Sequence, residues 1–133
     1  MSTSARETIS EMRVALTVRD FDDAVRFYRD VIGLEPSADW SSEHGRCIVF
    51  NAGRATLELL DERQADYVDD VEVGRRVSGP VRIAFEVPDN GATVTRADAA
   101  GIPVESPGRL TPWGDRCARI VAPTGLQLTL FST

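Results

Sequence analysis

The sequence contains no lysine. All 15 basic side chains are arginine, so a catalytic lysine that forms a Schiff base with its substrate is excluded. One histidine, His44, and two cysteines, Cys47 and Cys117, are too few to build a zinc site from histidine and cysteine alone. The cysteines form no CxxC motif and indicate no disulfide framework, and packing alone accounts for them. A P-loop and an HExxH motif are also absent.

Long apolar runs are missing as well. No stretch approaches the ~18 residues of a membrane span, and the polar start MSTSARETISE does not resemble a signal peptide. The 21 acidic side chains outnumber the 15 arginines and give a net charge of −6, which argues against a nucleic-acid partner. We therefore expect one domain in the cytoplasm, with neither a membrane nor a nucleic-acid partner.

An internal repeat organises the chain. The segment RVALTVRD at 13–20 matches RIAFEVPD at 82–89, with four identical positions. Each copy alternates with the period of a half-buried strand, reaches an aspartate suited to cap a helix, and continues as a helical stretch that ends at Gly33 or Gly101. The match resumes at GRC against DRC and at LELL against LTLF. The repeat therefore predicts two copies of one βαβββ unit.

This repeat predicts an α+β fold with two tandem βαβββ modules. Strands are expected at 12–18, 36–41, 45–51 and 54–60 with a helix at 20–32, and then at 80–87, 103–108, 114–121 and 126–131 with a helix at 90–100. Residues 1–11 are expected to form a flexible tail before a single domain at 12–133. Within that domain, module one is 12–61, an acidic connector is 62–79 and module two is 80–131.

Alternation along the strands assigns side chains to two faces. In the first helix, Phe21, Ala24, Val25, Tyr28, Val31 and Ile32 are expected near one apolar face. Val14, Leu16 and Val18, with their counterparts in the other strands, should face the helices. The opposite face then carries a mixed set: Arg13, Ala15, Thr17, Thr56, Glu58, Leu60, Arg82, Ala84, Glu86, Gln127, Thr129 and Phe131. A curved mixed sheet with helices outside and such a face inside makes a small-molecule cleft.

Four segments carry a resemblance to a known superfamily: RVALTVRDFDDAVRFYRDVIGLEP, GRATLELLD, VRIAFEVPD and TPWGDRCARIVAPTGLQLTLF. Together they resemble the glyoxalase, bleomycin-resistance and extradiol-dioxygenase superfamily, the vicinal oxygen chelate fold. The PWGDR segment and its following strand look most like the metal-free, bleomycin-resistance branch. The resemblance implies paired βαβββ modules that associate as a homodimer, with the ligand cleft at or near the subunit interface.

The same resemblance implies where a metal would bind. Metal-using members hold a divalent ion with four inward side chains, and the matching positions here are Arg13, Glu58, Arg82 and Thr129. Arginine keeps its proton and has no lone pair to donate, and threonine is a weak ligand. We therefore expect no metal and no other cofactor.

Two interpretations of the charged residues on the inner face remain open. Arg13 and Arg82 could grip an anionic or carbonyl-rich ligand, or they could pair internally with Glu58 and Glu86. Glu58 is a candidate general base if the surrounding leucines raise its pKa, whereas a nearby arginine would keep it ionised. No catalytic residue is otherwise indicated.

Aromatic residues complete the predicted site. Trp40 and Trp113 precede the third strand of each module and could stack on a flat ligand, or close the core or a dimer contact. Phe50, Tyr67 and Phe131 could extend the same wall. His44, in SSEHGR, is interpreted as a surface turn residue. The connector DERQADYVDDVEVGRR could steer a cationic ligand, but a solvated loop or short helix is favoured.

Together these features predict a metal-independent, homodimeric protein that sequesters an aromatic or glycopeptide antibiotic without a covalent step. The expected ligand-contacting residues are Arg13, Trp40, Phe50, Glu58, Leu60, Arg82, Glu86, Trp113, Thr129 and Phe131. The alternative is an enzyme of the same fold, such as an isomerase, cyclase, lyase, glyoxalase or dioxygenase, that uses Glu58 or Glu86 as base. Fold alone does not choose between a binding protein and an enzyme.

Overall fold

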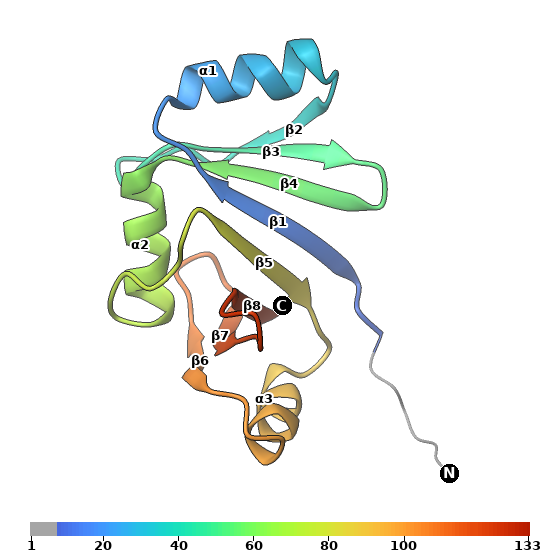
Figure 1. The fold of residues 1–133 in the computed structure, drawn as a ribbon, viewed down its shortest axis with the longest axis vertical. Coiled ribbons are helices and arrows are strands. Elements are labelled where there is room, and N and C mark those ends of the chain that lie inside the picture. Colours follow the sequence, from blue (N-terminus) through green and yellow to red (C-terminus); the bar gives the residue numbers. More distant parts are fainter. Residues whose placement is uncertain (1–7) are drawn as a thin grey trace.

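The computed structural model describes residues 8–133, which form one curved eight-stranded sheet with helices packed on it (Figure 1). The strand order is β2-β3-β4-β1-β5-β8-β7-β6. The strands are β1 (Glu11–Thr17), β2 (Glu35–Asp39), β3 (Cys47–Ala52), β4 (Ala55–Leu60), β5 (Val81–Glu86), β6 (Val104–Leu110), β7 (Arg116–Val121) and β8 (Gln127–Ser132). The helices are α1 (Phe21–Arg26), the π-helical turn η1 (Phe27–Val31), α2 (Glu62–Glu72) and α3 (Asn90–Ala99).

The sheet register confirms the predicted pair of modules. Within each module the first strand pairs in parallel with the last, β1 with β4 and β5 with β8. The two modules join where β1 and β5 pair antiparallel, with Arg13 opposite Ala84 and Ala15 opposite Arg82. Every predicted strand is present, and its ends lie within a few residues of the predicted ones.

Each α-helix is capped by the aspartate that precedes its first residue. The side chains of Asp20, Asp61 and Asp89 accept hydrogen bonds from the backbone N–H groups of the third residue beyond them. Such a cap satisfies an N–H group that the helix itself leaves without a partner. The sequence predicted the caps at Asp20 and Asp89, whereas the cap at Asp61, which starts the helix of the connector, was not predicted.

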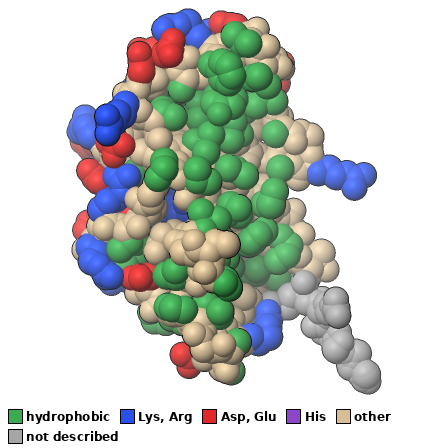
Figure 2. All heavy atoms as spheres, in the orientation of Figure 1, with side chains coloured by type: hydrophobic (Ala, Val, Ile, Leu, Met, Phe, Trp, Pro, Cys, Tyr) green, Lys and Arg blue, Asp and Glu red, His purple; other side chains and the backbone are tan. Residues whose placement is uncertain are grey.

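The outer face of the sheet is apolar, as the alternation predicted. Phe21, Phe50 and Leu59 pack together under α1, and Val94, Ile120 and Leu130 pack together under α3. Figure 2 shows hydrophobic side chains running across the strands between these two helices. Met12 and Val81 stay partly exposed there.

The prediction for the end of the first helix was wrong. Val31 and Ile32 were assigned to its apolar face, but they are 71% and 55% exposed. The N–H of Ile32 bonds to the carbonyl of Phe27, five residues back, so the last turn is wider than an α-helical turn. The wider turn rotates both side chains away from the sheet, while Tyr28 still packs on the core.

The connector forms a short helix, one of the two forms that the sequence favoured, but it is not a solvated segment. This helix, α2, buries Gln64, Ala65, Val68, Asp69 and Glu72 on its inner side. At the other end of the domain, Glu11 already belongs to β1, so the boundary predicted for the tail falls inside this strand. Residues 1–7 of that tail lie outside the described residues. Among residues 8–133, no helix is long and apolar enough to cross a membrane.

Candidate functional site

A cavity of about 700 Å³ opens on the inner face of the sheet and is lined by both modules. Its floor comes from the central strands β1, β4, β5 and β8, and its walls come from α2 and the loops before β3 and β7. Polar and charged lining residues are Glu11, Arg13, Ser41, Ser42, His44, Glu58, Gln64, Glu72, Arg82, Glu86, Asp115, Thr129 and Thr133. Apolar and aromatic ones are Trp40, Cys47, Tyr67, Val68, Ala84, Pro112, Trp113, Cys117 and Phe131.

Four residues from the four central strands meet on the floor of this cavity. Nη1 of Arg13 lies 3.6 Å from Oε2 of Glu58, and Nη2 of Arg82 lies 3.7 Å from Oε1 of Glu58. Nη1 of Arg82 also donates a hydrogen bond of 2.9 Å to the hydroxyl of Thr129. Of the two interpretations, the structure therefore shows both arginines paired internally with Glu58. Glu86 lines the cavity but pairs with neither arginine.

Glu58 is a buried carboxylate with unused hydrogen-bonding capacity. Burial raises its pKa above the usual value, although Arg82 and Arg13 act in the opposite direction. Both guanidinium groups are beyond hydrogen-bond distance, so the Glu58 oxygens accept no hydrogen bond within residues 8–133. Glu58 can thus accept a hydrogen bond or a proton from a molecule in the cavity.

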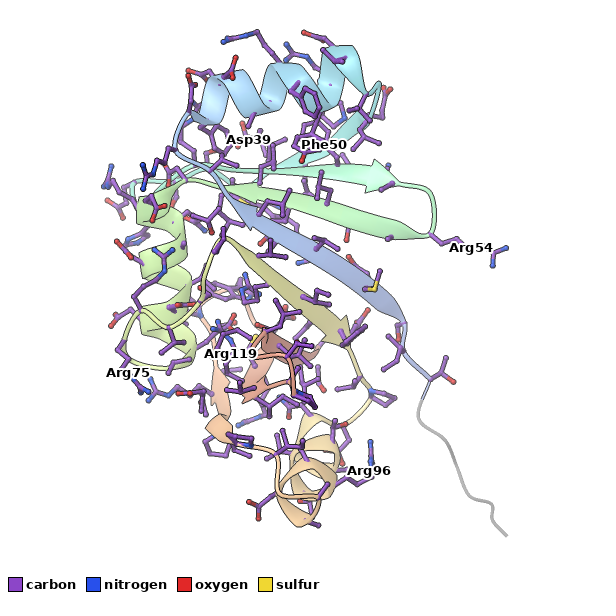
Figure 3. The ribbon with its side chains drawn as sticks, viewed as in Figure 1. Asp39, Phe50, Arg54, Arg75, Arg96 and Arg119 are labelled. Carbon is purple, nitrogen blue, oxygen red and sulfur yellow. The ribbon has the colours of Figure 1, made fainter. Side chains whose placement is uncertain are left out.

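A second ionic network lies between α2 and the sheet, around Arg119 (Figure 3). Arg119 is fully buried and donates to Asp69 at 3.0 Å and to Glu72 at 2.7 Å. Oε1 of Glu72 also accepts a hydrogen bond of 3.0 Å from Thr129. Because Thr129 accepts from Arg82 as well, the two networks form one continuous chain of polar contacts. This chain fixes α2 to the cavity floor.

An aromatic wall rises beside α2. The rings of His44 and Tyr67 stack face to face with centroids 3.8 Å apart, and Trp113 lies 6.2 Å from Tyr67. On the other side, the guanidinium of Arg13 lies 5.0 Å from the ring centre of Trp40 and 5.2 Å from that of Phe131. Trp40 and Trp113 are both close to half exposed. Flat surfaces for stacking are therefore available at the cavity mouth.

His44 is the exposed turn residue that the sequence predicted, and its ring also forms part of this wall. The loop that carries it is fastened to the start of α2. Arg63 donates a hydrogen bond of 2.9 Å to the carbonyl of Glu43. A side chain at Gly45 would come within 2.4 Å of the backbone nitrogen of Gln64, so only glycine fits this close approach. No sequence pattern indicated this contact, since it depends on the presence of α2.

Two of the predicted ligand-contacting residues lie elsewhere. Phe50 is fully buried under α1, on the opposite face of the sheet (Figure 3). The register explains this, since Phe50 pairs with Leu57 and shares its outward orientation. Leu60 points inward but is covered by Ala15 and Val68, so it does not reach the large cavity. The other eight predicted residues all line it: Arg13, Trp40, Glu58, Arg82, Glu86, Trp113, Thr129 and Phe131.

Several lining residues were not predicted. Gln64 and Glu72 reach the cavity only because the connector is a helix with its inner side on the sheet. Asp115 was visible in PWGDR, but only Trp113 was singled out there. Cys47 and Cys117 lie at equivalent places in the wall, and burial raises the pKa of both thiols. They are therefore protonated and unreactive near neutral pH.

Comparison with known proteins settles the family. The model of the Glyoxalase/Bleomycin resistance protein/Dioxygenase superfamily matches residues 12–130. The chain belongs to this superfamily. No curated protein sequence matches it significantly.

Solved structures of this superfamily's fold are similar over almost the whole chain. The hypothetical protein BH1468 from Bacillus halodurans C-125 has a TM-score of 0.71 and 12% identity, covering 97% of this chain and 96% of that one. Methylmalonyl-CoA epimerase from Mycobacterium tuberculosis has a TM-score of 0.67 and 19% identity, covering 98% and 92%. A superfamily member from Vibrio splendidus 12B01 has a TM-score of 0.64 and 14% identity, covering 95% and 100%. At these identities the likeness shows the fold alone.

The donor set at the four positions where the resemblance implies a metal does not fit a metal ion here. Arg13 and Arg82 offer only N–H donors and positive charge, so Glu58 would be the one strong ligand among the four. Within residues 8–133, no group of three or more histidine, cysteine, aspartate or glutamate side chains is arranged to hold a metal. These four positions therefore supply hydrogen-bond donors and acceptors to the cavity in place of metal ligands.

Proposed function

We propose that this member of the Glyoxalase/Bleomycin resistance protein/Dioxygenase superfamily binds a compact aromatic molecule in its cavity without a metal ion and protects the cell by sequestering it, as an antibiotic-binding protein would. The arrangement of Arg13, Glu58, Arg82 and Thr129 carries the proposal. At the positions that would present ligands to a metal, these residues pair with one another and leave polar atoms facing an aromatic-walled space.

The size of the cavity supports a compact ligand. Pockets that bury most of a drug-sized molecule have volumes of roughly 300–1,000 Å³, and this one measures about 700 Å³. A fused aromatic ring system fits such a volume, whereas a whole glycopeptide antibiotic would extend far outside it. Of the two antibiotic classes predicted from the sequence, the aromatic class is therefore favoured.

Binding follows from complementary contacts. Trp113, Tyr67 and Trp40 offer flat faces at the mouth, and Phe131 lies deeper. On the floor, Glu58 accepts hydrogen bonds from the ligand, while Arg82 and Arg13 donate to its carbonyl or hydroxyl oxygens. No covalent step is required. The homodimer inferred from the family resemblance stays a prediction, because the cavity described here is lined by a single chain.

One observation favours a second candidate function, an isomerase that transfers protons. Glu58 is buried, has a raised pKa and accepts no hydrogen bond within the described residues, as a general base in a cavity would. It would remove a proton from carbon next to a carbonyl group, and the resulting enolate oxygen would lie against Arg13 and Arg82. The protonated Glu58, after exchange with solvent, would then return one proton to carbon in the product, so that atoms balance and solvent deuterium can enter. Glu86 lines the cavity too, but it is less buried.

Incubating the protein with a panel of aromatic compounds in D₂O containing EDTA separates the two functions. Bound compounds are recovered, and their masses are measured by mass spectrometry. Sequestration predicts retention at the original mass, and a Trp113→Ala variant should lose the retained compound. Deuterium incorporation by the parent protein that Glu58→Gln abolishes would show that the protein is an isomerase and not a sequestering protein. Absence of any retained or altered compound would contradict both functions.

A further inference from the structure

Negative side chains outnumber positive ones in the lining of the cavity. Five carboxylates line it, those of Glu11, Glu58, Glu72, Glu86 and Asp115, against the two guanidinium groups of Arg13 and Arg82. Arg13 donates two hydrogen bonds to Glu11 and lies near Glu58, which Arg82 also approaches. Glu72 is compensated by the buried Arg119 behind it. The positive charges of the two cavity arginines are thus already balanced by the protein's own acids, although N–H groups of both arginines still face the cavity.

Glu86 and Asp115 are the two cavity carboxylates that pair with no arginine of the described chain. Neither carboxylate has a hydrogen bond or an ion pair with any residue in 8–133. Glu86 stands directly opposite Glu11 across the β5–β1 pair, and like charges in that position repel each other. Burial raises the pKa of Asp115, to which Glu72 and Glu11 contribute while Arg13 opposes them. A positive group in the cavity would offset the cost of burying the Asp115 carboxylate and the repulsion between Glu86 and Glu11.

Two further features of the same cavity favour a positive partner. The ring faces of Tyr67 and Trp113 carry partial negative charge and attract cations. Gln64, only 8% exposed, also lines the cavity, and its side-chain oxygen has no hydrogen-bond partner among residues 8–133. A buried acceptor without a donor costs stability, so a ligand N–H group that reached it would be stabilising.

Charge and aromatic walls therefore point to one class of ligand. We propose that the cavity selects aromatic cations: a flat ring system stacks on Trp113 beside Tyr67, and the unpaired carboxylates Glu86 and Asp115 balance its positive charge. The acidic lining concentrates cations at the mouth and disfavours anions of the same shape. This inference rests on the proposed function, since it names the charge of the aromatic ligand that the cavity binds.

Three probes of one shape test the charge preference: N-methylacridinium, which is a permanent cation, acridine, which is neutral at pH 8, and acridine-9-carboxylate, which is an anion. Equilibrium dialysis at low salt with EDTA measures each affinity. We expect the cation to bind about tenfold more tightly than acridine and the anion to bind most weakly. The double variant Glu86→Gln/Asp115→Asn should reduce the cation's advantage to about twofold and leave acridine unchanged.

The matched control removes two exposed acids away from the cavity lining, Asp70 on α2 and Asp98 on α3, in the variant Asp70→Asn/Asp98→Asn. It changes the net charge equally and should keep the cation's advantage. An equal loss in both variants would assign the preference to overall charge and overturn the inference. Binding of all three probes with equal strength would also overturn the inference. If that binding still required Trp113, the proposed function would stand.

The remaining outcomes separate the two claims further. If no acridine probe binds while other aromatic compounds in the panel are retained, the aromatic cation is the wrong ligand class and the proposed function stands. If neither the probes nor the panel are retained, both claims fail. A divalent metal ion tested alone completes the set, because saturable binding of the metal that Glu86→Gln/Asp115→Asn abolishes would make these acids a metal site instead.

Discussion

Arg119 and Glu72 form a fully buried ion pair, with Nη2 of the arginine 2.7 Å from Oε1 of the glutamate. The arginine comes from β7 in the second module, and the glutamate comes from the last turn of α2. Glu72 also accepts a hydrogen bond from Thr129, which in turn accepts one from Arg82. The helix that walls the cavity and the arginine on its floor are thus held by the same chain of contacts.

Removing the arginine of this pair should destabilise the protein strongly. Arg119→Met leaves Glu72 buried without a counter-charge and Asp69 with only the more distant Arg76, at 3.8 Å; breaking such buried pairs costs about 3–5 kcal/mol of the free energy of unfolding. Urea denaturation at pH 7 measures the loss. Arg75→Met is the control, since Arg75 forms an exposed pair with Glu105 that should contribute at most about 1 kcal/mol. Equal losses in the two variants would contradict a structural role for the buried network.

The stability of the fold should fall in acid partly through Asp69. Burial alone would raise the pKa of this carboxyl, but the N–H groups of Ser78 and Val77, with Arg119 and the Ser78 hydroxyl, outweigh it and lower the pKa. Its stabilising contribution is therefore full above its unfolded pKa of about 4 and is lost as the pH falls through the folded value. The stability difference between Asp69→Asn and the parent should shrink from pH 7 to pH 3. The neighbouring exposed Asp70→Asn variant should show no such trend.

Glu58 should affect stability in the opposite direction. Burial raises its pKa in the folded chain, so the folded state holds this proton more tightly than the unfolded chain does. The associated stability is present below the unfolded pKa of about 4 and is lost as the pH rises through the folded value. Glu58→Gln cannot lose this proton, so it should gain stability relative to the parent between pH 4 and pH 8 in urea titrations. A relative loss over that range would show that the arginine pairing outweighs burial.

Two aromatic residues should respond in opposite ways to truncation. Phe50→Ala empties a fully buried site under α1 and should cost about 3–5 kcal/mol of unfolding free energy without changing cavity contacts. Trp113→Ala removes a side chain that is 44% exposed, so stability should change little while affinity for an aromatic ligand falls about tenfold or more. Thermal unfolding and equilibrium dialysis on the same samples compare them. If Phe50→Ala lost affinity and Trp113→Ala lost stability instead, the binding surface would lie on the outer face of the sheet, which would contradict the proposed site.

Gly45 should be intolerant of any side chain. The Cβ atom of Gly45→Ala would meet the backbone of Gln64 and the carboxylate of Asp61, so the loop that carries His44 must move away from α2. The stack of His44 on Tyr67 should then separate, with a loss of stability and of ligand affinity. Gly79→Ala serves as the control, since nothing lies near the added atom there. The NMR ring resonances of His44 report the stack, and unchanged resonances in Gly45→Ala would refute the contact.

The sequence predicted the fold well because the repeat and the strand alternation are local patterns. The period of two placed Arg13, Glu58, Arg82 and Thr129 on one face, and the register of four central strands then brings them together. Phe50 was misplaced because its strand was treated as part of the cavity wall, although alternation from Cys47 puts its side chain outside. Val31 and Ile32 were misplaced because a π-helical turn leaves no distinct mark in composition.

The connector was the largest gap in the prediction of the site. Its many charged residues are typical of a solvated loop or a short exposed helix. Its buried side can be identified only once Arg119 is known to lie beneath Asp69 and Glu72. Arg119 itself sits in a strand whose other residues are mostly apolar, so nothing nearby marks its partners. Contacts between α2 and β7 are distant in sequence, and Gln64, Tyr67 and Glu72 enter the cavity only through them.

Metal content and ligand retention, measured on one purified sample before and after treatment with EDTA, test the central claim most directly. We predict a substoichiometric content of divalent metal and unchanged retention of the aromatic ligand after chelation. One equivalent of a divalent ion per chain, removed by EDTA together with ligand binding, would contradict a metal-independent site, because the arginines at positions 13 and 82 would then have failed to exclude the ion from the cavity.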